Sequence, residues 1–168
     1  MKNTGKKFEE LFKKSAIEQG FDYTRLKDAG YVGDKSESRR FTPKNICDCI
    51  LFGYGHLFYL ELKSRVSSLR FDEVTQYSAL MKKEDSLQSS RKTLMASAGV
   101  VIHFQKTDRV FYYNIALTEQ LMIDTGKKSF NTSDIESLAS DHPSLCFELH
   151  KFIPERKRSN RINLEELF

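Results

Sequence analysis

The 168-residue sequence has no tryptophan, only three cysteines and three prolines, and no long apolar run. A transmembrane helix needs about 20 consecutive apolar residues, and the N-terminal segment lacks the apolar region of a secretory signal peptide. The cysteines leave no second ligand pair for a zinc site. We therefore expect buried thiols in a reducing cytoplasm, bacterial or that of a phage host, and no membrane partner.

The residues that are present suit one small domain. Hydrophobic residues make up 39% of the chain and include thirteen Phe and seven Tyr, enough for a single core. We see no linker, repeat or low-complexity segment, so we expect one domain over residues 1–168. The net charge of +4 and the pI of about 8.9 suit a nucleic-acid partner without requiring one.

Two short apolar segments at 45–52 and 57–65 predict a β-hairpin, because Gly-Tyr-Gly-His separates them. The turn consists either of two residues or of all four. Both choices place Asp48 directly opposite Glu61, with Cβ atoms about 5 Å apart. Lys63 follows Glu61 by two residues and projects to the same face.

This arrangement suits a divalent cation. Two carboxylates directly opposite each other repel, whereas two hard oxygen ligands bind Mg²⁺ or Mn²⁺ together with waters and phosphate oxygens. Lys63 is then placed to orient a nucleophile or to stabilise charge on a phosphate. The alternative is a salt-bridged, partly exposed sheet face, but the apolar surroundings favour a site. Cys47 and Cys49 are expected to face away from Asp48.

The rest of the chain predicts helices before and after this hairpin, and therefore an α/β layered domain. Expected helices cover 5–19, 71–81 and 117–124, and a capping box at 133–136 begins another. Expected strands cover 21–26, 100–104 and 110–115. The segment 28–44 is expected to be a polar, basic loop, and 84–97 is ambiguous and expected to be partly loop.

Several segments together resemble the PD-(D/E)xK nuclease superfamily, and within it the RecU-type Holliday junction resolvases, including their phage relatives. The segments that carry the resemblance are 5–9, 45–48, 58–63, 71–76, 99–102 and 161–168. The resemblance implies a restriction-endonuclease-like mixed central sheet flanked by helices. Two departures stand out: Cys47 occupies the usual proline position, and 84–98 is longer and more polar than in the family.

The resemblance also implies a metal site and an activity. Glu9 would join Asp48 and Glu61 as a ligand of Mg²⁺, for which Mn²⁺ would substitute, although Glu10 competes for that role. Lys63 would complete the catalytic set. The implied activity is that of a magnesium-dependent endodeoxyribonuclease.

Basic and aromatic residues are the expected contacts to DNA. In the RecU family the region corresponding to the 28–44 loop projects as a stalk into the junction, and Phe41 would suit stacking on an exposed base. A second basic cluster comprises 156–158 and Arg161, and it either contacts the duplex arms or keeps the tail soluble. The DNA-binding residues that we expect are Arg25, Arg39, Arg40, Phe41, Lys44, Arg65 and Gln76.

The sequence therefore predicts a Holliday junction resolvase of DNA recombination and repair. Resolving a junction needs paired nicks at symmetric points, which a C2 homodimer with one site per subunit supplies. Two alternatives stay open: another PD-(D/E)xK endonuclease, restriction-like or for repair, and a non-catalytic DNA-binding module on the same fold.

Overall fold

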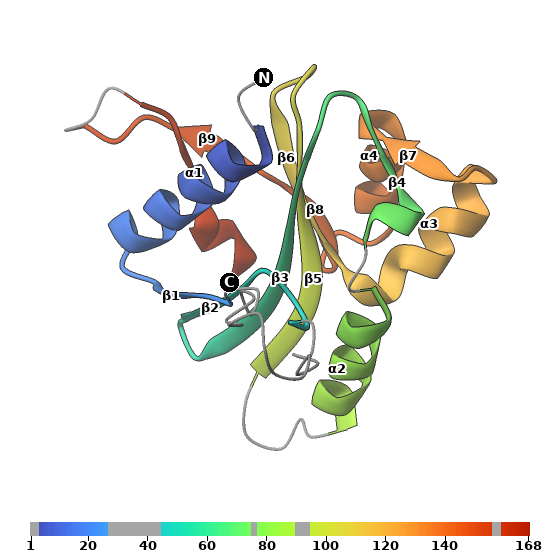
Figure 1. The fold of residues 1–168 in the computed structure, drawn as a ribbon, viewed down its shortest axis with the longest axis horizontal. Coiled ribbons are helices and arrows are strands. Elements are labelled where there is room, and N and C mark those ends of the chain that lie inside the picture. Colours follow the sequence, from blue (N-terminus) through green and yellow to red (C-terminus); the bar gives the residue numbers. More distant parts are fainter. Residues whose placement is uncertain (1–3, 27–44, 75–76, 90–94, 156–158) are drawn as a thin grey trace, which may run out of the picture.

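The computed structural model of the chain describes residues 4–26, 45–74, 77–89, 95–155 and 159–168 (Figure 1). The α-helices are α1 (Thr4–Glu18), α2 (Tyr77–Ser89), α3 (Thr118–Thr125) and α4 (Thr132–Asp141). Short 3-10 helices are η1 (Phe71–Glu73), η2 (Ile115–Leu117) and η3 (Leu164–Leu167). The segment 28–44, which the sequence predicts to be a basic loop, lies outside the described residues.

The central sheet is mixed. Its strands are β1 (Asp22–Arg25), β2 (Cys49–Gly53), β3 (His56–Arg65), β5 (Met95–Phe104), β6 (Arg109–Asn114) and β8 (Cys146–Leu149), in the order β1-β2-β3-β5-β6-β8. The pair β3–β5 is parallel, and the other neighbours are antiparallel. Two-stranded sheets are formed by β4 (Ser68–Arg70) with β7 (Ser129–Asn131) and by β9 (Lys151–Phe152) with β10 (Arg161–Ile162).

Helices cover both faces of this sheet, as Figure 1 shows: α1 lies on one side and α2, α3 and α4 on the other. The helix α1 buries Phe8, Phe12 and Ala16 because these residues recur every four positions along one helix face. The central strand β5 is buried on both faces, as expected for a strand with a parallel neighbour in the middle of a sheet. The observed architecture confirms the predicted mixed sheet flanked by helices.

The predicted hairpin is present, and its turn has two residues. Gly53 pairs with His56, and Tyr54 and Gly55 have φ angles of 46° and 79°. Two consecutive positive φ angles define the type I′ turn, whose twist matches that of the two strands. The register continues from this pair to Cys49 opposite Leu60, as the sequence predicted.

The region after the hairpin differs from the prediction. A helix over 71–81 was expected, but η1 ends at Glu73, and α2 begins at Tyr77 and continues to Ser89. Buried Glu84 explains this length, because its carboxylate accepts hydrogen bonds from Ala98 N–H at 2.6 Å and from Asn114 Nδ2 at 3.1 Å. The helix is thereby held against β5 through a segment that we expected to be partly loop.

The start of α4 also differs by two residues. The predicted capping box used Ser133 and Glu136, whereas the observed box uses Asn131 and Asp134. Asn131 Oδ1 accepts from Ser133 N–H and Asp134 N–H, and Asp134 Oδ2 accepts from Asn131 N–H. The chain leaves β7 at Asn131, so the first free amides of the helix lie earlier than the prediction placed them. Within the described ranges, no helix is both long and apolar enough to cross a bilayer.

Candidate active site

Asp48 is held by backbone groups of both neighbouring strands. Its N–H donates to Leu60 carbonyl at 3.1 Å, its carbonyl accepts from Leu26 N–H at 2.9 Å, and its Oδ2 accepts from Leu62 N–H at 2.8 Å. Leu60 is also the partner of Cys49, so two residues of the first strand face one residue of β3, as in a β-bulge. These contacts fix the Asp48 carboxylate beside β3.

The bulge corrects one prediction about the flanking cysteines. Cys47 packs in the core on the α2–α4 side of the sheet, whereas Cys49 packs in the core on the α1 side. We expected both thiols on the face opposite Asp48, but the strict alternation of a strand ends where the chain bends before β2. Burial raises the pKa of Cys47 to about 12, as expected for an inert structural thiol.

Glu61 is fully buried in the middle of β3, and Lys63 lies beside it. Lys63 Nζ is 2.5 Å from Glu61 Oε1, so the two side chains form an ion pair. Apart from its contacts with Lys63 and Asp48, the Glu61 carboxylate has no hydrogen-bond partner among the described residues. Burial, and then the nearby Asp48 charge, raise the pKa of Glu61 to about 7, against the opposite effect of Lys63.

The donor set at this point fits a hard divalent cation. A buried carboxylate is unfavourable unless a positive charge compensates it, and one lysine faces two carboxylates here. Mg²⁺ is commonly bound by one or two carboxylates together with waters. In the described part of the chain, no three His, Cys, Asp or Glu side chains come together as a metal-binding group. Asp48 and Glu61 are the two carboxylates that lie together at this point, and their role as metal ligands stays a prediction.

Glu9 forms an ion pair at the edge of the sheet. Its Oε2 is 2.6 Å from Arg25 Nη2 at the end of β1, while Glu10 is exposed on α1. Arg25 pairs in register with Cys49, and Cys49 directly follows Asp48 in the sequence. The ion pair therefore lies next to the bulge across the sheet. The role of Glu9 as a third ligand stays a prediction.

The predicted DNA-binding residues that the structure describes differ in their exposure and in their ion pairs. Arg25 is half exposed despite its contact with Glu9, and Arg65 is paired with Glu73, a residue that the sequence did not single out. Arg161 is buried against Glu18 and joins the C-terminal segment to α1, so it is not available to DNA as part of a basic cluster. The predicted contacts that lie outside the described residues are Arg39, Arg40, Phe41, Lys44 and Gln76.

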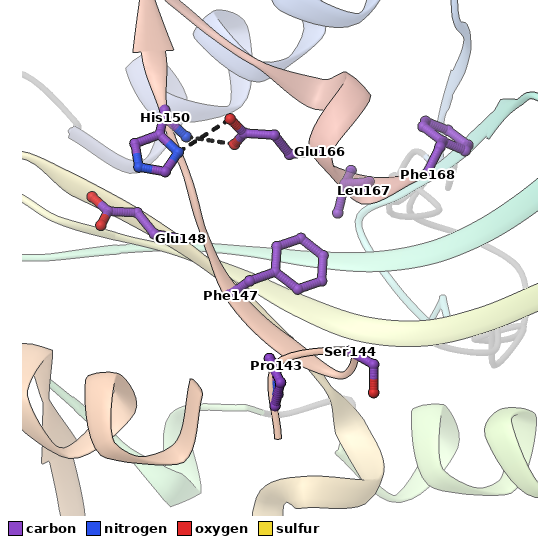
Figure 2. Close-up of a pocket in the computed structure, with 8 residues that line it drawn as sticks. All are labelled: Pro143, Ser144, Phe147, Glu148, His150, Glu166, Leu167 and Phe168. Carbon is purple, nitrogen blue, oxygen red and sulfur yellow. Dashed lines mark hydrogen bonds and ion pairs between the residues drawn. The ribbon is translucent and has the colours of Figure 1, made fainter. Parts of the chain in front are cut away.

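A separate hollow of about 520 Å³ lies at the other edge of the sheet. Figure 2 shows its lining from β8 and η3, with His150 bonded to Glu166 through both its backbone N–H and its ring Nδ1. Strands β5 and β6 separate β8 from the strand that carries Glu61. This hollow therefore takes no part in the arrangement around Asp48.

Sequence similarity to known proteins covers less than half of the chain. No family model matches the chain. An uncharacterized protein, YotM, of the SPbeta prophage in Bacillus subtilis (strain 168) is 42% identical over 72 residues, which are 42% of this chain and 36% of YotM. The match therefore spans about a third of that relative's length.

A solved structure covers more of the chain. Hjc, a Holliday junction resolvase of the archaeal hyperthermophile Archaeoglobus fulgidus, aligns with 77% of this chain and 90% of its own, with a TM-score of 0.50. The sequence identity is 15%, so the likeness establishes a shared fold. The mixed sheet with helices on both faces is thus the fold of a known junction resolvase.

The raised pKa of Glu61 predicts a pH-dependent stability. The folded protein holds the proton from pH 4.5 up to about 7, so the stability of the metal-free protein falls as pH rises through that window. Glu61→Gln removes this penalty. Its gain in unfolding free energy should be near zero below pH 4.5 and rise to at most about 3 kcal/mol above pH 7. Urea unfolding at several pH values in chelator is the measurement.

Glu10→Gln is the matched control, because it removes the same charge from an exposed position of the same chain. The stability difference between this variant and the wild type should stay flat over the same pH range. A Glu61→Gln gain that is equally large at pH 4 and pH 8 would contradict the buried carboxylate as its cause.

Proposed function

We propose that the chain is a metal-dependent, structure-selective DNA endonuclease that resolves four-way junctions by paired symmetric nicks. The observation that carries the proposal is the fully buried carboxylate of Glu61 beside Asp48 and Lys63. An acidic pair that is costly to bury suits a cation-binding role better than a structural one. The fold shared with Hjc, a Holliday junction resolvase, supports junction DNA as the substrate.

The side chains have separate roles in this proposal. Asp48 and Glu61 would hold Mg²⁺ or Mn²⁺, which when bound lowers the pKa of water and neutralises charge on phosphate. Leu62 N–H donates to Asp48 Oδ2 and so keeps this carboxylate beside β3. Lys63, of which 16% of the side chain is exposed, reaches solvent from beside Glu61 and would donate to a phosphate oxygen or to the attacking water.

A homodimer of the RecU type, acting in recombination and repair, is the assembly that this chemistry requires. The two strands to be cut in a four-way junction are related by two-fold symmetry, which a C2 dimer matches. Another PD-(D/E)xK endonuclease would share the site without selecting four-way junctions.

The alternative from another class is a DNA-binding module on the same fold, without catalysis. The presence of Asp48, Glu61 and Lys63 argues against it, because a module that only binds DNA has no need of a buried acidic pair beside a lysine.

The decisive experiment compares substrates and metals. Labelled four-way junction, linear duplex and single strand are each incubated with the protein in Mg²⁺ or in EDTA. We expect nicking of the junction in Mg²⁺ only, and none by Asp48→Asn, which should fold and bind junction as the wild type does. Junction binding without cleavage in any divalent metal would favour the DNA-binding module, and nicking by Asp48→Asn would exclude the assigned site.

Lys63→Ala tests the role of the amine separately from that of the metal. The rate of cleavage should fall by about 10²–10³-fold, the usual effect of losing one donor to developing charge. The apparent Mn²⁺ affinity should change far less, because the amine does not bind the cation. Single-turnover rates over a Mn²⁺ titration separate the two effects, and a near-normal rate at saturating Mn²⁺ would leave Lys63 as an ion-pair partner only.

The double change Arg39→Ala with Arg40→Ala tests how the junction is selected. If the 28–44 loop enters the open centre, binding to four-way junction should weaken more than binding to linear duplex, because general phosphate contacts affect both substrates alike. Phe41→Ala should act similarly, with a loss of about 1–3 kcal/mol for a ring stacked on a base. Titrations at several salt concentrations measure this, and equal losses on both substrates would make the loop a general electrostatic patch.

A further inference from the structure

Three functional side chains follow one another along one face of β3. Glu61, Lys63 and Arg65 alternate with buried residues of the opposite face, so all three project toward the α2–α4 side. Their partners on β5 are core residues of that same side: Val100, Ile102 and Phe104. Arg65 therefore extends the line of the candidate active site by one step, about 7 Å beyond Lys63.

Arg65 forms an ion pair with the carboxylate of Glu73. Glu73 Oε2 lies 2.5 Å from Arg65 Nε, and Arg65 Nη1 donates to Ser64 carbonyl at 2.9 Å. Arg65 Nη2 has no hydrogen bond to any residue that the structure describes. About a third of each side chain in the pair is exposed, so solvent and ligands reach the contact.

The segment that carries Glu73 is anchored in the core. In η1, Phe71 packs on Phe130 with ring centroids 5.3 Å apart, and Phe71 N–H donates to Lys128 carbonyl at 3.2 Å. Val74, directly after Glu73, is buried. The Glu73 backbone is thus fixed at both ends, and its side chain alone has to turn for Arg65 to become free.

We infer that Arg65 forms a second phosphate subsite next to the cleavage site, and that Glu73 fills this subsite until DNA binds. The inference rests on the proposed function, because it takes the phosphate at Lys63 as the one to be cleaved. Two residues along a strand span a distance similar to that between successive phosphates of one nucleic-acid strand. The phosphate next to the cleaved one therefore reaches Arg65 and displaces the Glu73 carboxylate.

Guanidinium chemistry allows this exchange. Arginine presents a planar set of donors that matches carboxylate and phosphate alike, so each is a substitute for the other. A partly exposed ion pair contributes little to stability, and the Glu73 contact is therefore weak enough to open. While closed, it prevents Arg65 from holding other anions beside the acidic pair.

The test is a double-mutant cycle on DNA affinity. A fluorescently labelled duplex is titrated in EDTA with the wild type, with Glu73→Gln and with Asp72→Asn. Asp72 is the matched control, since it lies one residue away, has the same charge and pairs with exposed Arg70. Glu73→Gln should tighten binding by roughly two- to fivefold, the size of one exposed ion pair. Asp72→Asn should give a clearly smaller gain, and thermal melting checks that both variants are folded.

Arg65→Met completes the cycle. This change should reduce the salt dependence of binding by about 0.9 in the slope of log K against log salt, as expected for one lost phosphate contact. In this background Glu73→Gln should no longer tighten binding. Equal gains for Glu73→Gln and Asp72→Asn, or a gain that persists without Arg65, would overturn the subsite.

The two proposals fail differently. If the wild type nicks junctions in Mg²⁺ but the two carboxamide variants bind equally well, the subsite is wrong and the proposed function stands. If the wild type binds no DNA in any form, the proposed function is wrong and the subsite with it.

Discussion

The rest of the structure depends on the pairing of β3. This strand pairs with β2 through the hairpin and with β5 in parallel along all ten of its residues. A parallel pair requires a crossover connection, and α2 lies in that connection, held to β5 by the buried Glu84 carboxylate. Because β3 is covered on both faces, Glu61 has no water to compensate its charge, while the end of the strand still brings Lys63 and Arg65 to the surface.

Burial of Glu61 is the main local conflict in the fold. The sheet would be more stable with an apolar residue at this position, since a buried carboxylate near a second carboxylate is unfavourable. Such conflicts concentrate at functional sites, where chemistry rather than stability decides the residue. Around the acidic pair, ion pairs with Glu9 and Glu73 hold the two described arginines that we expect at DNA. The free protein is thus balanced in charge at the very surface that would meet phosphates.

Much of this arrangement was predictable because it depends on short-range order. A two-residue turn and the alternation of side chains fix the register of a hairpin, so Asp48 and Glu61 could be placed near each other from the sequence. The predicted direct pairing of these two residues is not observed, because the register ends at Cys49 opposite Leu60. The spacing of Phe8, Phe12 and Ala16 likewise predicted helix α1 and its buried face. The length of α2 was not predictable, because it depends on Glu84 reaching Ala98 N–H from fourteen residues away. The bulge at Asp48 was missed because backbone bonds to Leu26 and Leu60 from two other strands create it.

The sequence by itself determined the chemistry available to this protein: two carboxylates and a lysine on a hairpin whose register is set locally. The tertiary structure decided how those groups behave. Packing on both faces of β3 removed water from Glu61 and raised its pKa. Folding brought Glu9 to Arg25, Glu73 to Arg65 and Glu18 to Arg161, so the fold decides which arginines remain exposed. The reason is physical: hydrogen-bond register is local, whereas desolvation and ion pairing depend on every segment that packs nearby.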